Sequence, residues 1–333
     1  MDITERVQTR KAQPDDHDDI REITADTWPD REGQDYLGRV YQRWLESGER
    51  PKHTLVAVVD GQAVAIAQCV MLTDTEGWGQ GLRVHPDYRG KGLSRLLTGE
   101  LFAWARSQGA TVIRAMVHAW NEAGLGQSRA SGYLPAGTFR WVYPTVGDDD
   151  MATAHLESVD RPWLDRPPSA AVESDPDIAW RAYQGSAAQT TVGGLGLSLD
   201  ESWATAEVSP SMLRRASEET AVIAIQGDAG AIGMSYRSRT FDRETDAGEK
   251  ETIAEYGIAS WSSEGAAAVL LDAIAREAAA ISADRARVAV PNRPVEISDA
   301  ALCRAKVAES AEIIMAADLA GTADHAVVFE AER

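Results

Sequence analysis

The stretch that most constrains this chain is QGLRVHPDYRGKGLSRLLTGELFA, which covers residues 80–103. Apolar residues alternate with others as far as Pro86, and this proline ends a strand because it has no N–H to donate to a neighbouring strand. After the Arg-Gly-Lys-Gly of residues 89–92, leucines recur at the spacing of a helix. The stretch therefore predicts a strand, a glycine-containing turn and a helix, in that order.

The turn at residues 89–92 has the chemistry of a diphosphate site. Its two glycines let the backbone turn sharply and let a ligand approach it closely. The helix that follows begins with unpaired N–H groups and with the positive end of its dipole, and Arg89 and Lys91 add positive charge. Two common phosphate-binding patterns do not fit. No Gly-x-x-x-x-Gly-Lys precedes a serine or threonine, and Gly-x-Gly-x-x-Gly fails at Arg95.

The stretch resembles the acetyl-CoA loop of the GNAT superfamily of N-acyltransferases, whose pattern is Arg/Gln-x-x-Gly-x-Gly/Ala. Arg89, Gly92 and Ser94 occupy its three positions, with serine in place of the last small residue. The resemblance implies acetyl-CoA as co-substrate, held by backbone N–H groups of the strand and of the loop. The predicted coenzyme-binding residues are Leu82, Arg83, Val84, Arg89, Gly90, Lys91, Gly92, Leu93, Ser94 and Asn121.

A second cassette, residues 121–133, strengthens this resemblance. Its members match the spacing of the family's second pattern without a gap; they are Asn121, Gly124, Gln127, Ser128, Gly132 and Tyr133. The family's usual tyrosine, which donates a proton to the leaving thiolate, falls on Ser128. Asn121 is expected to hydrogen-bond the pantetheine arm or the start of the next helix. Within the superfamily, GLRVHPDYRGKG with a second motif that lacks the tyrosine most resembles the vertebrate histidine N-acetyltransferase-like group.

The order of predicted elements extends the resemblance over residues 3–145. It runs strand, two helices, a hairpin around Asp60-Gly61, strand, loop, helix, strand, helix and strand. We therefore expect an α/β fold built on a mixed sheet. In this fold the first two helices flank the acceptor pocket, which makes Tyr36, Tyr41 and Trp44 candidates to line it, although an aromatic stripe at helical spacing is more often part of the core.

The second half of the chain repeats the order of elements and predicts a second GNAT-like unit. Its long helix, residues 264–280, follows Ser262-Ser263-Glu264-Gly265 rather than a pair of spaced glycines. Ser263 is predicted to cap this helix, and Glu264 would repel a phosphate there. A later helix is predicted at residues 298–307, capped by Ser298. We therefore divide the chain into an acetyltransferase domain (1–146), a linker (147–176) and a degenerate GNAT-like domain without coenzyme (177–333).

Composition limits the partners. With 52 acidic and 33 basic residues the formal charge is −19, which disfavours nucleic acid. No apolar run approaches the ~20 residues that span a bilayer, and the N-terminus does not read as a signal peptide, so we expect no membrane and a cytoplasmic protein. Two distant cysteines and six scattered histidines predict no metal. A homodimer is compatible with the sequence.

Acetyl transfer from a thioester to an amine sets the remaining roles. A backbone N–H at a bulge near Leu82 or Arg83 would stabilise the oxyanion. The amine must lose a proton to a base, for which His118 and Glu76 are the candidates; a structural histidine in a strand is the commoner alternative for His118. A thiol of pKa ~8.5 can leave without a strong acid, with Ser128 holding a water instead.

The sequence thus predicts an acyltransferase that moves the acetyl group of acetyl-CoA directly to a primary amine of a small molecule or amino acid. The alternative is a binding module, an acyl-CoA sensor or scaffold that keeps the loop and has lost the chemistry. The replacement of the family's tyrosine by Ser128 points toward this alternative, although a thiolate can depart without that acid.

Overall fold

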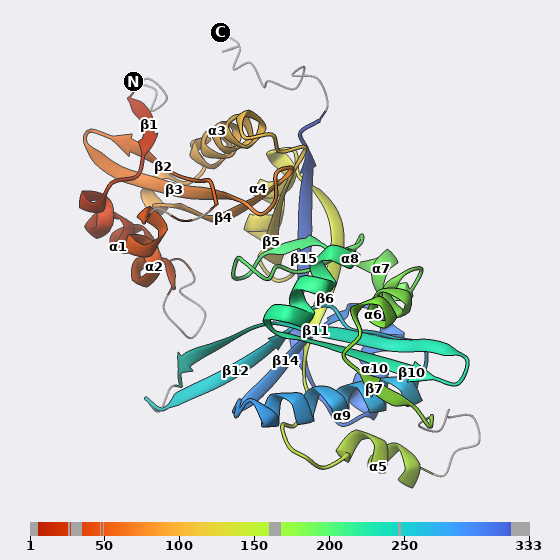
Figure 1. The fold of residues 1–333 in the computed structure, drawn as a ribbon. Coiled ribbons are helices and arrows are strands. Elements are labelled where there is room, and N and C mark those ends of the chain that lie inside the picture. The colour runs from red at the N-terminus through yellow and green to blue at the C-terminus, as the bar shows by residue number, and fades with distance from the viewer. Residues whose placement is uncertain are drawn as a thin grey trace. The chain divides into compact units, whose positions relative to one another are not determined.

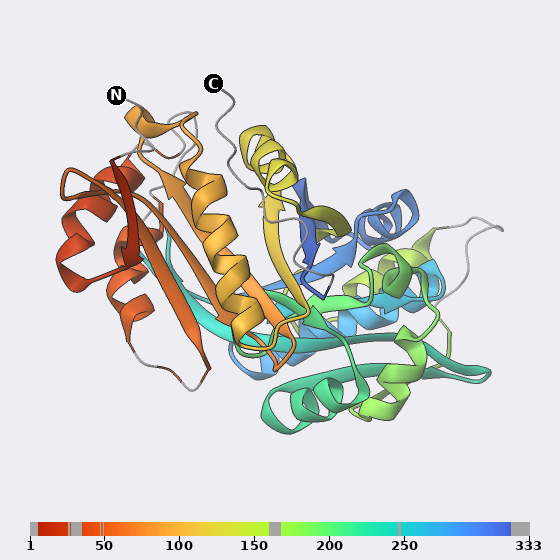
Figure 2. The same cartoon turned by 90° about the horizontal axis from the view of Figure 1, so that it is seen from above.

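The computed structural model describes residues 6–25, 27, 35–46, 48, 50–159, 168–245 and 248–320. They form two compact units, each built from strands of a mixed sheet and covering helices (Figures 1 and 2). The first unit comprises Met1–Ala115, Glu122–Pro135 and Met315–Arg333, and the second comprises Met116–Asn121 and Ala136–Ile314. The predicted α/β class with a mixed sheet is confirmed. The units are not contiguous in sequence, unlike the predicted ranges 1–146, 147–176 and 177–333.

Among the described residues of the first unit, strands β1 to β5 lie side by side in chain order, and β15 (Lys306–Asp318) follows β5. The first five are β1 (Val7–Lys11), β2 (Lys52–Val59), β3 (Gln62–Met71), β4 (Glu76–Val84) and β5 (Val112–His118, of which residues 112–115 belong to this unit). Among these five, all neighbours are antiparallel except β4 and β5, which are parallel. The β2–β3 hairpin turns at Asp60 and Gly61, both with positive φ, as a two-residue hairpin turn requires.

Helices cover both faces of this part of the sheet (Figure 1). On one face lie α1 (His17–Ala25) and α2 (Leu37–Leu45), and on the other lies α3 (Leu93–Ser107); α4 (Glu122–Ala130) follows β5. Ile20, Leu37 and Tyr41 pack on Val56 and Ile66 and form the core below α1 and α2. Residues 28–34, between the two predicted helices, lie outside the described residues. Among the residues that the structure does describe, no helix has the length and apolar character needed to cross a membrane.

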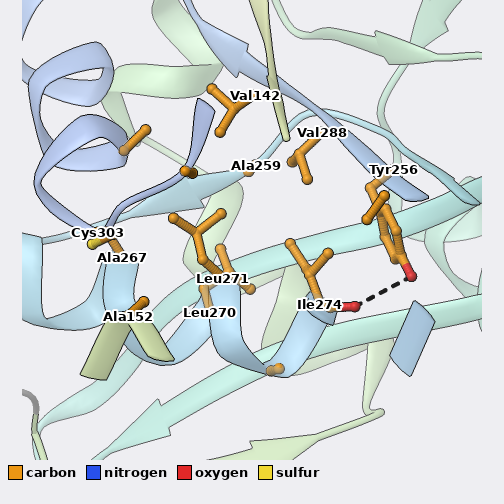
Figure 3. Packing of buried hydrophobic residues seen from close by; sticks show 14 of the residues in the cluster. Val142, Ala152, Tyr256, Ala259, Ala267, Leu270, Leu271, Ile274, Val288 and Cys303 are labelled. Atoms are coloured by element: carbon orange, nitrogen blue, oxygen red, sulfur yellow. Dashed lines mark hydrogen bonds between the residues drawn. The ribbon is translucent and has the colours of Figure 1, made fainter. Parts of the chain in front are cut away.

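The second unit has its own row of strands. In spatial order they are β6 (Leu134–Tyr143), β14 (Arg285–Pro291), β12 (Lys250–Tyr256), β11 (Gly230–Glu244), β10 (Ala221–Gly227) and β7 (Ala171–Glu173), with β13 (Ser260–Trp261) on β11. Among these described strands, β12 and β14 pair in parallel, and the other neighbours pair antiparallel. The long helix α9 (Glu264–Ala280) packs Leu270 and Ile274 against Tyr256 and Val288, and the Tyr256 hydroxyl donates to the Ile274 carbonyl (3.4 Å; Figure 3).

The opposite face of the second unit has a separate core. It is covered by α6 (Pro176–Tyr183), α7 (Ala187–Thr191), α8 (Pro210–Glu219) and the small hairpin of β8 (Leu195–Leu197) and β9 (Thr205–Glu207). Here Tyr236 of β11 is fully buried, and its hydroxyl donates to the Leu197 carbonyl (2.7 Å). This contact fixes the small hairpin on the sheet.

Part of the predicted linker belongs to the core of the second unit. Helix α5 (Met151–Ser158) buries Ala152 and Leu156 beside α9. The buried carboxylate of Asp272 accepts the N–H groups of Ala152 and Thr153, each at 2.9 Å. An aspartate placed this way satisfies N–H donors that a helix leaves unpaired at its start. Residues 160–167 of the linker lie outside the described residues.

The helix predicted at residues 298–307 is wrong in its bounds. Helix α10 begins at Pro294 and ends at Leu302, and strand β15 (Lys306–Asp318) follows at once. Proline is favoured in the first turn of a helix because no N–H is needed there. Ser298 therefore lies inside the helix, where its hydroxyl donates to the Val295 carbonyl (2.8 Å), and it is not the cap.

Strand β15 contributes residues to both units, which is one reason why neither unit is continuous in sequence. Its residues 306–314 belong to the second unit, where the Thr138 hydroxyl of β6 donates to the Glu312 carbonyl (3.0 Å). Its last residues belong to the first unit, and there Leu319 donates its N–H to the Thr111 carbonyl (2.8 Å). One strand thus serves both units, which contiguous domain ranges cannot describe.

The turn before α9 differs from the turn before α3 in length as well as in charge. Only Ser262 and Ser263 separate β13 from α9, whereas residues 85–92 separate β4 from α3. Ser263 caps α9, its hydroxyl accepting the Ala266 N–H (3.3 Å), and Glu264 lies in the first turn. The predicted cap is confirmed. Two residues leave no loop that could surround a diphosphate.

We therefore expect one acetyl-CoA site per chain. Titration of the full chain by calorimetry should give a stoichiometry of one, because the carboxylate of Glu264 repels phosphate at the start of α9. Glu264→Gln removes this charge and serves as the matched control, and its stoichiometry should also be one because the turn stays short. Two equivalents bound by the wild-type chain would contradict this reading of the second unit.

Candidate functional site

The loop before α3 takes its shape from two glycines. The chain leaves β4, forms a short 3-10 turn at Pro86–Tyr88, and passes through Gly90 and Gly92, whose φ angles are 73° and 81°. A Cβ on either glycine would meet nothing within 4 Å. Left-handed backbone conformation, rather than lack of space, is therefore what requires glycine at these two positions.

Gly92 presents the start of α3 to solvent. It is the N-cap residue and has no side chain to accept the first N–H groups of the helix. The first helical hydrogen bond runs from the Leu96 N–H to the Gly92 carbonyl (3.0 Å). The N–H groups of residues 93–95 are therefore available to a ligand. Leu93 itself is 3% exposed. Of the predicted coenzyme residues, Leu93 thus offers only its backbone, while its side chain holds the loop to the core.

The two basic side chains of the loop bond to its backbone. Arg89 Nε donates to the Val84 carbonyl (3.3 Å). Lys91 Nζ donates to the Asp87 carbonyl (2.8 Å) and lies 4.9 Å from the centre of the Tyr88 ring. Arg89 and Lys91 are both exposed, so each can turn to an anion without disturbing the core.

Strand β4 contains a bulge beside this loop. Gln80 pairs with Gln68 and Arg83 pairs with Ile66, so that Gly81 and Leu82 stand opposite a single residue of β3. Gly81 has a φ of 64°, and a Cβ there would collide with the ring of Trp44. The predicted bulge in β4 therefore exists, and it changes the direction of the backbone N–H groups near Leu82 and Arg83.

Glu76 is the partner of a buried ion pair. It stands at the first residue of β4, is 6% exposed, and bonds to the Arg114 guanidinium of β5. Eight residues of strand, about 26 Å, separate it from Val84 at the loop. Removing one partner of a buried pair leaves an uncompensated charge. This geometry assigns Glu76 to holding β4 against β5 and does not support its predicted role as a base.

His118 ends β5 and lies in the second unit, where it meets a carboxylate that the sequence did not connect with it. Its Nδ1 is 3.0 Å from Oε1 of Glu312, which is 4% exposed. Its ring stacks on Trp120 (centroids 5.0 Å apart, planes 12° apart) and meets Trp203 edge-on at 5.8 Å. A carboxylate on Nδ1 fixes the tautomer that leaves Nε2 able to accept a proton. Position 312 carries no motif, so only the fold could reveal this pair.

The other predicted residues have structural surroundings of their own. Asn121 directly precedes α4, and its N–H donates to the His118 carbonyl (2.9 Å). Ser128 is 5% exposed on α4, and its carbonyl accepts the Tyr133 N–H (3.0 Å). Arg83 forms an ion pair with Asp35 (2.6 Å).

Of the three aromatic residues considered for an acceptor pocket, Tyr41 belongs to the core. It is fully buried, its hydroxyl donates to the Gln13 carbonyl (2.6 Å), and burial raises the pKa of Tyr41. Its candidacy is therefore wrong. Tyr36 is 38% exposed and meets Trp44 edge-on at 6.4 Å, so these two stay candidates.

Comparison with known proteins agrees with this geometry. Residues 17–126 match the model of the acetyltransferase (GNAT) family. A GCN5-related N-acetyltransferase from Sphaerobacter thermophilus has a similar structure, with a TM-score of 0.54, 15% identity, and 94% of this chain and 96% of that chain covered. A tandem GNAT protein from the clavulanic acid biosynthesis pathway has a TM-score of 0.51 and 14% identity, with 95% and 99% covered. No curated protein matches the chain.

These two structures extend over nearly all of the chain, and at such identities they speak for its fold alone. The predicted architecture of two GNAT-like units is thereby confirmed. The matched segment contains β4, the loop and α3 together with the start of α4. The match to the acetyltransferase (GNAT) family model is thus carried by residues 17–126, about a third of the chain.

Proposed function

We propose that this chain is an N-acetyltransferase that moves the acetyl group of acetyl-CoA directly to a primary amine of a small molecule or an amino acid. The observation that carries the proposal is the loop of the first unit, where Gly90 and Gly92 take positive φ and leave the start of α3 unpaired. The bulge at Gly81 and Leu82 lies in the strand that leads into this loop. An anion site and a re-aimed N–H on one strand-loop-helix suit a thioester with a diphosphate tail.

The transfer needs few groups. The amine nitrogen attacks the thioester carbon, the carbonyl oxygen becomes an oxyanion, and the C–S bond then breaks to release the thiolate. An N–H of the bulge at Leu82 or Arg83 stabilises the oxyanion. A base accepts the proton that the amine loses, and the thiolate takes up a proton from water.

For the base we propose His118. Within the second unit its Nδ1 faces the buried Glu312 carboxylate, which suits a group that accepts a proton at Nε2. Glu76 is engaged with Arg114 at the start of β4. The finer resemblance to the histidine N-acetyltransferase-like group stays a prediction, and it places amino acids first among the acceptors to be tried. A cytoplasmic location is also a proposal.

The first test concerns the loop. Gly92→Asp places a carboxylate where the diphosphate would lie, and we expect at least a tenfold loss of acetyl-CoA affinity by calorimetry, since hydrogen bonds to charged phosphate are worth roughly 1.5–3 kcal/mol each. Gly92→Asn carries the same backbone cost without charge. Gly99→Asp adds the same charge further along α3, at an exposed site with nothing within 4 Å of its Cβ. Unchanged affinity in Gly92→Asp would remove the coenzyme from this loop.

The second test concerns activity. With acetyl-CoA and a panel of amines and amino acids, the wild-type chain should release free CoA thiol, and His118→Gln should lower the rate by about 10²–10⁴. The deficit should shrink as pH rises toward the amine pKa of ~10.4, where less proton removal is needed. Glu312→Gln should show a smaller deficit with the same pH trend. Acetyl-CoA binding without thiol release from any amine would identify a sensor or scaffold instead.

The third test concerns the leaving thiolate. Ser128→Ala should lower turnover less than tenfold, under ~1.4 kcal/mol of barrier, because a thiol leaves readily without an acid. Ala130→Ser on the same helix, at an exposed position, is the control for adding or removing one hydroxyl. A loss of several hundredfold in Ser128→Ala would make this hydroxyl a direct participant.

A further inference from the structure

Strand β4 carries glycines at alternate positions, and one of them meets a phenol. A Cβ built on Gly79 would lie 2.9 Å from the Tyr133 hydroxyl oxygen, closer than side chains tolerate, and 3.7 Å from Ile113 Cδ1. Tyr133 is 6% exposed. Glycine at position 79 is thus required by the close approach of this hydroxyl to the strand, whereas Gly90 and Gly92 are required by their φ angles.

The position of Tyr133 is fixed from several sides within the first unit. Gly132 has a φ of 97° and turns the chain before it. The Tyr133 N–H donates to the Ser128 carbonyl (3.0 Å), and its ring meets Phe102 of α3 edge-on at 5.2 Å. Burial raises the pKa of Tyr133, with Cys69 a second cause. The hydroxyl therefore stands at β4 as a rigid, neutral group.

The Tyr133 hydroxyl lies at the point where the pairing of β4 with β5 ends. Among the described residues, the parallel pairs of these strands end at Trp78 with Arg114, and the Arg114 carbonyl is 3.7 Å from the same Cβ position on Gly79. Three residues further along, about 10 Å, comes Leu82 of the bulge. Between them, the Trp44 ring packs against Gly81. Trp44 of α2 and Tyr133, which packs on Phe102 of α3, thus meet β4 on opposite faces of the sheet.

Resting on the proposed function, we infer that Tyr133 sets the length of the acyl group that this chain accepts. The diphosphate loop follows the C-terminal end of β4 and the thioester carbonyl faces the bulge, so an acyl chain points back along β4 toward Gly79. An acetyl methyl stops near the bulge. A longer apolar chain would run past Gly81 into the hydroxyl of Tyr133, which is held and cannot move aside. Tyr133 is a specificity-determining residue in this arrangement.

Affinities for acyl-CoA esters test the inference without an acceptor. The dissociation constants of acetyl-, butyryl- and hexanoyl-CoA should rise in that order for the wild-type chain, with hexanoyl-CoA at least tenfold weaker than acetyl-CoA. Tyr133→Leu should cut this ratio at least fivefold while acetyl-CoA affinity stays within threefold. Tyr143→Leu, the same change in the second unit, should keep the wild-type ratio. An unchanged ratio in Tyr133→Leu with acetyl-CoA still bound overturns the inference and leaves the proposed function intact. Failure of the wild-type chain to bind acetyl-CoA overturns both.

Two more variants distinguish the effect of the Tyr133 hydroxyl from that of its ring. One of them tests the contact with Gly79 through protein stability, without any ligand. Tyr133→Phe should keep acetyl turnover. If this variant keeps the wild-type ratio of hexanoyl-CoA to acetyl-CoA dissociation constants but loses acetyl turnover, the phenol acts as a proton donor and the inference is contradicted. Gly79→Ala should lower the melting midpoint by about 4 °C or more, and adding Tyr133→Phe should recover part of that loss, because the oxygen that meets the new methyl is gone. If the decreases in melting midpoint caused by Gly79→Ala and Tyr133→Phe simply add in the double variant, the close approach of the Tyr133 hydroxyl to Gly79 is contradicted, and with it the inference.

Discussion

The unpaired N–H groups at the start of α3 are the interaction on which the candidate site depends. A helix start is available to an anion only if no side chain caps it and the preceding backbone bends away, and Gly92 meets both conditions. The helix must also be held still. Leu93, Leu97, Leu101 and Ala105 are buried along one side of α3, so the helix that carries the candidate anion site is anchored in the core of the first unit.

The second unit shows what the same arrangement becomes without that opening. Its α9 is buried along most of its length and begins two residues after β13. Ser263 accepts the N–H of Ala266, and the carboxylate of Glu264 complements the dipole by roughly 0.3–1 kcal/mol. Each change stabilises the helix and removes a feature that a diphosphate needs. A helix start whose N–H groups are capped is more stable, whereas one left uncapped can bind an anion; α9 is capped by Ser263 and α3 begins at an uncapped Gly92.

The local features could be predicted from sequence because short-range physics determines them. The hairpin at Asp60-Gly61, the glycine turn before α3 and the cap at Ser263 each depend on the conformational preference of residues within one turn. What could not be predicted is carried by long-range packing. Glu312 reaches His118 across 194 residues, and strand β15 is shared by two units. No periodicity or spacing in the chain encodes such meetings.

Misassigned residues failed for the same reason. Glu76 looks like a free carboxylate in sequence, but β5 brings Arg114 to it. Tyr41 looks like part of a pocket wall, but its hydroxyl closes on the Gln13 carbonyl inside the core. In both cases a polar group that the sequence leaves open finds a buried partner, as buried polar groups must.

Ser128 stands where the resemblance places a tyrosine, and its backbone has a structural role of its own. The family's tyrosine would donate a proton from this position, and serine is a far weaker acid at that task. The backbone carbonyl of Ser128 nevertheless accepts the Tyr133 N–H, and this bond helps to set the phenol against Gly79. Because a thiol of pKa ~8.5 is a competent leaving group near neutral pH, the proposed transfer does not require an acid at this position. Ser128 and Tyr133 are both buried, so the contribution of Ser128 that the structure shows is the placement of the Tyr133 ring through its backbone carbonyl.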